Sequence, residues 1–366
     1  MALRWTSWSL VVLVVGCGTG GGDSSSFSPR PGAARAALTV AANQVSCTSP
    51  APRAFQAALC VCEDLDLVGH GMLVTSSDAL ASPVGVNGVT HVTGETRFAS
   101  GLSTWGGVTG AGDLEVGGDL VTPESVSVAG STRIGGDLVV GGDVETVGEL
   151  SVGGLARVSG NLHHVGSDPA LRFAGYRAPA GPPCGCDPST FIDVAALVAG
   201  AKAANDNARL GAVEHVGDLR LVLDGGRYYL SGLQSVGRLD LIVTKPSALF
   251  VDGDFETVGS DSLSVEEGAS LDLYVNGRLE NVGSWRVSDT TLAGVVRLYV
   301  GGADAMVQSV GAHDFVGALY APQAPVELVG DTSFRGALFV KSLSGVGELT
   351  VDYAAAAMPA AGACGP

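Results

Sequence analysis

The chain has few residues of the kinds that nucleic-acid binding and side-chain catalysis require. Lys and Arg number 20 against 37 Asp and Glu, a net charge of −17, which excludes a nucleic-acid binder because that function needs a basic face. The six histidines form no metal or catalytic motif, and neither a nucleophile elbow nor a phosphate loop is present. We therefore predict no enzymatic activity, no cofactor and no resident metal. Hydrophobic residues are nonetheless 46% of the chain, so it is not a disordered sequence.

The apolar run at the start of the chain, Leu10 to Val15, is too short to span a bilayer, which takes about 20 residues. With Arg4 before it, this run predicts a signal peptide over residues 1–16. Val14-Val15-Gly16-Cys17 resembles the bacterial lipobox, which implies that Cys17 is acylated and becomes the mature N-terminus. The alternatives are an ordinary signal peptide cut elsewhere and an uncleaved anchor. We expect an exported protein attached by lipid to the outer membrane or cell surface.

Cysteine is scarce, at seven residues, and its number fits export. Without Cys17 the count is even, and an even set outside the cytoplasm predicts disulfides. A four-cysteine metal site is the alternative, although such sites usually have two residues between paired cysteines. Six cysteines allow 15 pairings, among which the sequence does not choose. The disulfide candidates are Cys47, Cys60, Cys62, Cys184, Cys186 and Cys364.

Residues 17–46 are rich in Gly, Ser, Ala and Pro and predict a flexible tether, with an end-to-end span of about 30 Å. Residues 47–66 hold three cysteines, and we expect them to form a disulfide-stapled cap on the N-terminal end of the folded part. Residues 354–366 follow the last strand pattern as a C-terminal tail.

Glycine is abundant, and it marks a repeat of Val-Gly followed by a short apolar strand. Steps between successive valines are 17 to 28 residues, apart from one of 51. A unit of that size is too small to bury a core alone, so neighbouring units must stack. The valines are Val147, Val165, Val216, Val236, Val258, Val282, Val310, Val329 and Val346.

The segments after these glycines alternate apolar and polar residues, as in Leu219 to Leu223, which predicts strands with one inward face. The pattern predicts an all-β fold over residues 67–353, a parallel β-solenoid in which each coil lies on the previous one. The usual crossover preference favours a right-handed coil. Gly-Asp pairs predict corners, where the aspartate folds back on its own turn. If these aspartates stack they form a carboxylate ladder that Ca²⁺ would neutralise, although we favour solvated turns. The aspartates are Asp113, Asp119, Asp137 and Asp143.

The long step contains an insertion, residues 177–210. A Pro, Gly and Cys-rich loop precedes an alanine-rich segment, Thr190 to Ala208, which predicts a helix with Ser189 or Thr190 as N-cap. Its first half is apolar almost all round, so we expect it to pack on the side or end of the solenoid.

Two similar segments close the repeat region: Phe315-Val316-Gly317-Ala318-Leu319-Tyr320-Ala321-Pro322 and Phe334-Arg335-Gly336-Ala337-Leu338-Phe339-Val340-Lys341, followed by Val351-Asp352-Tyr353. With these motifs, residues 185–355 resemble an uncharacterised β-solenoid domain of bacterial cell-envelope proteins, including predicted lipoproteins and pilus-associated proteins. The Gly-Gly-Asp coils resemble bactofilin-type and adhesin solenoids more loosely. The resemblance implies an envelope location and carries no catalytic residues.

A structural or adhesive surface module is the function that we favour, with an envelope or matrix protein or polysaccharide as partner. Carbohydrate binding is the alternative, because Trp105, Trp285, Tyr228 and Tyr229 are able to stack on sugar rings. A polysaccharide-processing enzyme is the third candidate. His163, His164 and His215 lie beside Val-Gly repeats, and we interpret them as exposed turn residues.

Overall fold

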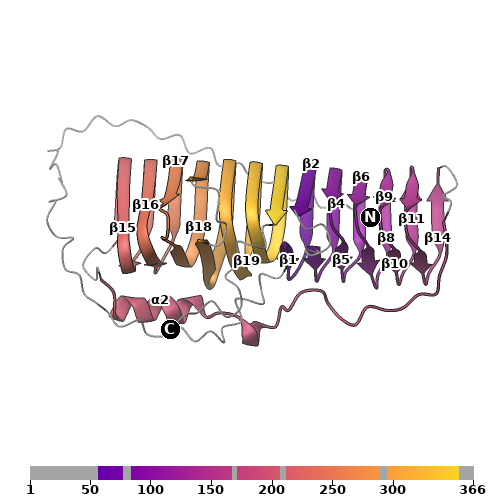
Figure 1. Ribbon diagram of the computed structural model, residues 1–366, viewed down its shortest axis with the longest axis horizontal. Coiled ribbons are helices and arrows are strands. Elements are labelled where there is room, and N and C mark those ends of the chain that lie inside the picture. Colours follow the sequence, from indigo (N-terminus) through magenta and orange to yellow (C-terminus); the bar gives the residue numbers. More distant parts are fainter. Residues whose placement is uncertain (1–56, 77–83, 167–170, 207–211, 289–294, 354–366) are drawn as a thin grey trace, which may run out of the picture. The chain divides into compact units, whose positions relative to one another are not determined.

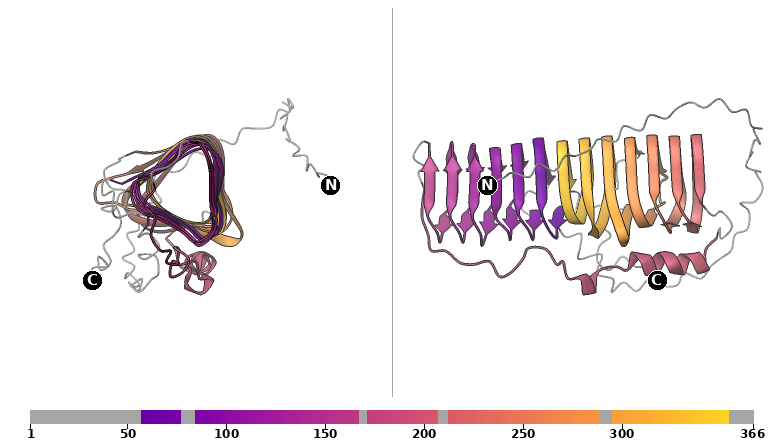
Figure 2. Two further views of the ribbon diagram at one scale, coloured as in Figure 1. Left: turned by 90° about the vertical axis from the view of Figure 1, so that its right-hand side faces the viewer. Right: turned by 180° about the vertical axis from the view of Figure 1, so that it is seen from behind.

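The computed structural model describes residues 57–76, 84–166, 171–206, 212–288 and 295–353, all within one compact unit, 41–366. These residues form a parallel β-solenoid with one α-helix beside it, which confirms the predicted fold class (Figure 1). Seen end-on, the coils are triangular, with three faces and three corners (Figure 2). Every strand pairing between coils is parallel, as in the stack of β4 on β2.

The strands fall into two groups along the chain. The N-terminal stack consists of β1 (Leu59–Val61), β2 (Leu65–Ser76), β3 (Val84–Val86), β4 (Thr90–Phe98), β5 (Leu102–Thr104), β6 (Val108–Val116), β7 (Leu120–Thr122), β8 (Val126–Ala129), β9 (Thr132–Ile134), β10 (Leu138–Val140), β11 (Val144–Val147), β12 (Leu150–Val152), β13 (Ala156–Val158) and β14 (Leu162–Val165). The C-terminal stack consists of β15 (Val213–Leu230), β16 (Leu233–Val251), β17 (Phe255–Val265), β18 (Leu271–Ser288) and β19 (Val296–Tyr353).

The core is a column of alternate side chains inside the coils. In β16, Leu239, Leu241 and Val243 are buried, and the residues between them face outward. This is the period-two pattern that the sequence predicts, repeated at each level about 4.8 Å apart.

The two stacks do not follow one another in space. The chain starts in the middle of the solenoid and winds outward to β14. It then returns alongside to the far end at β15 and winds back to the middle (Figure 1). The last coil of β19 therefore pairs with the first coil of the chain, Leu338 beside Leu59 and Val346 beside Val68. We call this contact the seam. The expectation that each coil lies on its predecessor in sequence is wrong here, because the long insertion carries the chain back along the solenoid.

The predicted N-terminal cap is also wrong for residues 57–66. Strand β1 pairs with β19 on one edge and with β3 on the other, so it is an interior strand rather than an end. Leu59 and Val61 are completely buried. The solenoid accordingly begins at Leu59 and not at residue 67, because the apolar side chains around Cys60 complete the same inner columns as those of the following coils.

We call residues 171–206 the strap. It contains a 3-10 turn, η1 (Pro188–Thr190), and the helix α2 (Val194–Ala203), which lies along the side of the C-terminal stack (Figure 2). The helix is shorter than predicted, and its N-cap is Asp193, whose carboxylate accepts from Ala196 N. The residues predicted as N-cap lie in η1, because Asp187 caps that separate turn.

The strap covers a row of aromatic rings on the outer face of the C-terminal stack. Phe250, Tyr274 and Tyr299 stack with ring centroids 4.6 to 4.7 Å apart. The ring of Phe191 meets Phe339 edge-on, and Ile192 N donates to Tyr320 Oη at 3.0 Å. The row continues the same outward column from coil to coil, so the strap shields an apolar strip that the stacking of the strands produces.

Corner side chains join successive coils. Each predicted turn aspartate accepts a hydrogen bond from a backbone N–H eighteen residues later, at 2.6 to 3.0 Å. The pairs are Asp113 with Ser131, Asp119 with Asp137, Asp137 with Leu155, and Asp143 with Asn161. The carboxylates thus reach the next coil instead of folding back on their own turn. They occupy different corners, and of the four only Asp119 and Asp137 are stacked neighbours, so the single carboxylate ladder is wrong.

Candidate functional surface

The Val-Gly repeats form one outer corner of the solenoid. Each repeat glycine sits above the glycine of the neighbouring coil; a Cβ built on Gly259 would lie 1.9 Å from Gly237 O. Each valine before the glycine points outward. From the β15 end to the seam and across it, eight valines follow one another, spanning about 34 Å. They are Val216, Val236, Val258, Val282, Val310, Val329, Val346 and Val68.

These valines are exposed, between 36% at Val310 and 84% at Val216. Beyond Val68 the same positions hold Thr93, Ala111 and Ala129, and valine returns at Val147 and Val165. We call this line of outward valines the ridge. Isolated apolar residues on a surface are ordinary, but a contiguous apolar strip of this length is typical of an interaction site.

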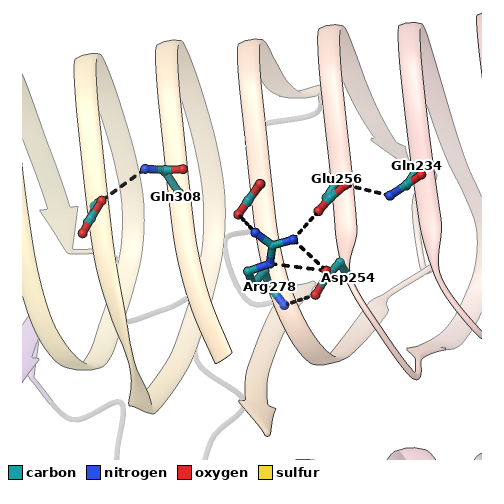
Figure 3. Close-up of polar contacts among 7 residues, drawn as sticks. Gln234, Asp254, Glu256, Arg278 and Gln308 are labelled. Carbon is teal, nitrogen blue, oxygen red and sulfur yellow. Dashed lines mark hydrogen bonds and ion pairs between the residues drawn. The ribbon is translucent and has the colours of Figure 1, made fainter. Parts of the chain in front are cut away.

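A polar ladder runs beside the ridge, two residues before each valine. In the C-terminal stack glutamines interrupt a row of glutamates, and the side chains bond from coil to coil (Figure 3). Gln234 donates to Glu256 at 2.8 Å, and Gln308 donates to Glu327 at 3.2 Å. Like charges directly opposite each other on neighbouring strands repel, and the interposed glutamines relieve this. The ladder positions are Glu214, Gln234, Glu256, Glu280, Gln308 and Glu327.

Arg278 neutralises the acidic centre of the ladder. Its guanidinium lies 2.8 Å from Glu256 and 2.9 Å from both Glu280 and Asp254 (Figure 3). Burial raises the pKa of Asp254, but hydrogen bonds from the backbone N–H and the guanidinium of Arg278 outweigh it, so that this pKa lies below its usual range. Hydrogen bonding to Asp254 and the nearby carboxylates raise the pKa of Arg278. Three carboxylates share one cation, and the surface keeps a negative excess beside an apolar ridge.

We expect Arg278→Met to lower the free energy of unfolding by about 1 to 2 kcal/mol at pH 7, because three carboxylates lose the cation they share. The effect is modest because the cluster is partly exposed and screened by water. The depressed pKa of Asp254 means that its contribution is present above about pH 4 and disappears as the pH falls through its folded-state value. The difference between variant and wild type should therefore shrink as the pH falls from 7 into acid. Urea unfolding at pH 7 and in acid measures it.

The matched control is Arg286→Met, in the same strand, at an exposed arginine for which the described part of the chain shows no ion pair. It should leave stability unchanged at both pH values. An Arg278 effect that persists unchanged in acid would contradict an electrostatic origin.

The aromatic and histidine candidates do not gather into a site. Trp285 stacks on Phe255 and meets Phe315 edge-on, and Tyr229 is buried beneath Lys202 of the helix. Trp105 lies in the other stack. His163 is exposed, whereas His164 and His215 are half-buried beside the ridge, and His164 Nδ1 lies 2.8 Å from Thr146 Oγ1. The aromatics therefore form no common platform for a sugar.

Several polar side chains lie inside the coils, where the sequence pattern did not predict them. Asn281 donates to Thr257 Oγ1 at 2.7 Å and to Asp261 at 2.5 Å, and burial raises the pKa of Asp261. A cavity of about 10 Å³ beside Asp261 has room for one water molecule. His313 is also buried, and burial lowers its pKa. Asp261 and His313 stand in an inward column that holds leucine at Leu219 and Leu239. Asn281 continues a second inward column after Ser235 and Thr257, and only the register reveals both.

Four of the six disulfide candidates pair. Cys60 bonds Cys184 and Cys62 bonds Cys186, so both cystines tie the strap to the strand in the middle of the solenoid. Within the described residues no three His, Cys, Asp or Glu side chains are placed to hold a metal ion, and no helix has the length and apolar character needed to cross a bilayer. Cys17, Cys47 and Cys364 lie outside the described residues.

Residues 186–358 match a family model described as a domain of unknown function (DUF7305). The match starts in the strap at Cys186 and covers the C-terminal stack, which agrees with the resemblance over residues 185–355. The resemblance is confirmed as far as an uncharacterised β-solenoid domain, and its link to lipoproteins and pilus-associated proteins stays a prediction. Neither a search of curated proteins nor a search of solved structures found a match.

Proposed function

We propose that this protein is an exported, lipid-anchored structural or adhesive module of the bacterial envelope, without catalytic activity, that presents the ridge to another envelope or matrix component. The observation that carries the proposal is the ridge itself, an apolar strip that continues over eight coils with acidic side chains beside it. A rigid, repetitive strip suits a long partner better than a small molecule. The acidic ladder favours a partner whose apolar strip carries basic flanks.

Export is supported by the two cystines, because disulfides persist in oxidising compartments. Attachment is assigned to Cys17, where several acyl chains on one residue would hold the protein stably at the outer membrane or cell surface. Radiolabelled fatty acid should enter the wild-type chain and not Cys17→Ser. Labelling of both chains would contradict the anchor and leave the ridge untouched.

The ridge is tested with Val258→Lys/Val282→Lys, which places two cations in the middle of the apolar strip. We expect saturable binding of the chain to isolated envelope and matrix components to fall at least about tenfold, a loss of about 1.4 kcal/mol. The matched control is Val222→Lys, at a valine off the ridge with the same 47% exposure as Val282.

The same panel includes purified glycans, since carbohydrate binding is the alternative function. Saturable binding to one glycan class that survives the ridge double variant would favour a lectin. Turnover of that glycan would show a polysaccharide-processing enzyme. Equal loss in Val222→Lys and in the double variant would contradict the ridge as the binding surface.

A further inference from the structure

Both ends of the solenoid are made of internal coils, because the first and last described strands of the chain meet at the seam. One end is β15 and the other is β14 (Figure 1). Within the described residues, β14 pairs only with β11 and β15 pairs only with β16. Each end therefore presents a strand edge that neither terminus of the described chain covers.

The free edges carry unused backbone hydrogen-bonding groups. Val213 N donates to Gly232 O, toward β16, so by strand alternation Glu214 and Val216 direct their N–H groups to the open side. Val144 N donates to Asn161 O, so by the same alternation Leu162, one coil further on, directs its N–H away from β11. Among the described residues, Asp206 covers the β15 edge near Arg227: its backbone N–H donates to Arg227 O, and its carboxylate accepts from Arg227 N. Open parallel edges of this kind are templates for another strand.

The side chains at the two ends are incompletely buried. Leu219 and Leu221 in β15 are half-buried, whereas the same inward positions one coil further in, Leu239 and Leu241, are 3% exposed. At the other end Leu162 is half-buried, whereas Val144 below it is 1% exposed. Each end thus lacks the coil that would complete its core.

The two ends also match in register. Leu162 to Gly166 and Val213 to Gly217 occupy the same positions of the coil, since both align with Val-Gly corners of their stacks. Laying β15 of a second copy on β14 would place Val216 on Val165, continuing the ridge, and the carboxylate of Glu214 beside the imidazole of His163. Strand direction is parallel in both stacks, so the new pairing keeps the polarity of the solenoid.

The seam shows that parallel pairing of strand edges joins coils that are not consecutive in the chain. There Gly347 lies beside Gly69, and Leu343 beside Leu65, although the segments are distant in sequence. The parallel register and the glycine corner are the same as between consecutive coils. Contacts between the stacked strands hold that junction, together with the strap, which is bonded to Cys60 and packs Phe191 against Phe339.

We propose that the β14 end of one copy stacks on the β15 end of another, extending the solenoid head to tail. The interface is heterologous, so repetition gives a linear filament rather than a closed dimer. This interface lies at the two ends of the solenoid and not along the outward face of the ridge. It is therefore independent of the partner proposed above.

The test uses the exported chain carrying Cys17→Ser, so that lipid plays no part, followed by sedimentation velocity and electron microscopy over a range of concentrations. Wild type should form concentration-dependent linear stacks. Val216→Pro blocks the β15 end and Leu162→Pro blocks the β14 end, each at an N–H directed to the open side. Each variant alone should be monomeric, and a one-to-one mixture should form dimers and nothing longer. Unchanged melting temperatures verify that both variants fold.

A second pair of variants changes only exposed charges. His163→Glu should weaken stacking by bringing two carboxylates together, and adding Glu214→Lys should restore it. Val282→Lys, on the ridge but far from both ends, should stack like wild type. Monomers at every concentration, dimers of Val216→Pro alone, or loss of stacking in Val282→Lys would each overturn head-to-tail assembly.

Discussion

Gly69→Ala is expected to lower the free energy of unfolding by about 3 to 5 kcal/mol, although the substitution adds a single methyl group. Gly69 has φ of +137°, a conformation that residues with a side chain rarely adopt. An added Cβ would lie 2.2 Å from Gly347 O across the seam. Strain and steric overlap therefore act together at the junction between the two stacks. Urea unfolding of wild type and variant measures the cost.

Two other glycines provide the controls. In Gly112→Ala the added Cβ would lie 1.9 Å from Gly94 O, between consecutive coils, at a φ of +126°. This substitution should lower the free energy of unfolding by about as much as Gly69→Ala. Gly200→Ala lies in α2, where nothing comes within 4 Å of an added Cβ, and should instead stabilise by about 0.5 to 1 kcal/mol. If Gly69→Ala were tolerated while Gly112→Ala was not, the two stacks would not meet at the seam.

The second large effect concerns the strap. Removing both cystines with Cys60→Ser/Cys62→Ser is expected to cost about 5 kcal/mol, because each bond joins residues 124 apart and closing such a loop restricts the unfolded chain. The variant should also be cleaved faster within residues 171–206, since the strap is then held by non-covalent contacts alone. One such contact is Lys202 with Asp252 at 3.0 Å. Urea unfolding and limited proteolysis measure the two effects.

The single variant Cys62→Ser is the control. Cys60–Cys184 still closes nearly the same loop in this variant, so its free energy of unfolding should fall by only about 2 kcal/mol. Wild type under reducing conditions should behave like the double variant. If single and double variants lost the same stability, restriction of the unfolded chain would not be the cause.

The sequence predicted the character of the solenoid from short-range patterns. Alternation in segments such as Leu219 to Leu223 is a property of a single strand, and the Val-Gly corner needs only glycine's freedom at positive φ. The sequence also showed the repeated valines, but only the register shows that they point outward. The helix was predicted with wrong ends because Asp187 and Asp193 both have capping side chains, and only the contacts of each turn show which one starts α2.

Tertiary structure alone decided the order of the coils. Every coil offers similar edges, so the repeat does not say which coil lies beside which, and a cap at residues 47–66 was a natural expectation. The strap resolves this: tied at Cys184 and Cys186 to the middle of the solenoid, it delivers the chain to the far end, so that β19 winds back to β1 and β2. The local pattern determined what each coil is. A pairing between segments nearly three hundred residues apart determined where each coil lies. The reason is that parallel stacking depends on the facing strand edge and not on which part of the chain supplies it.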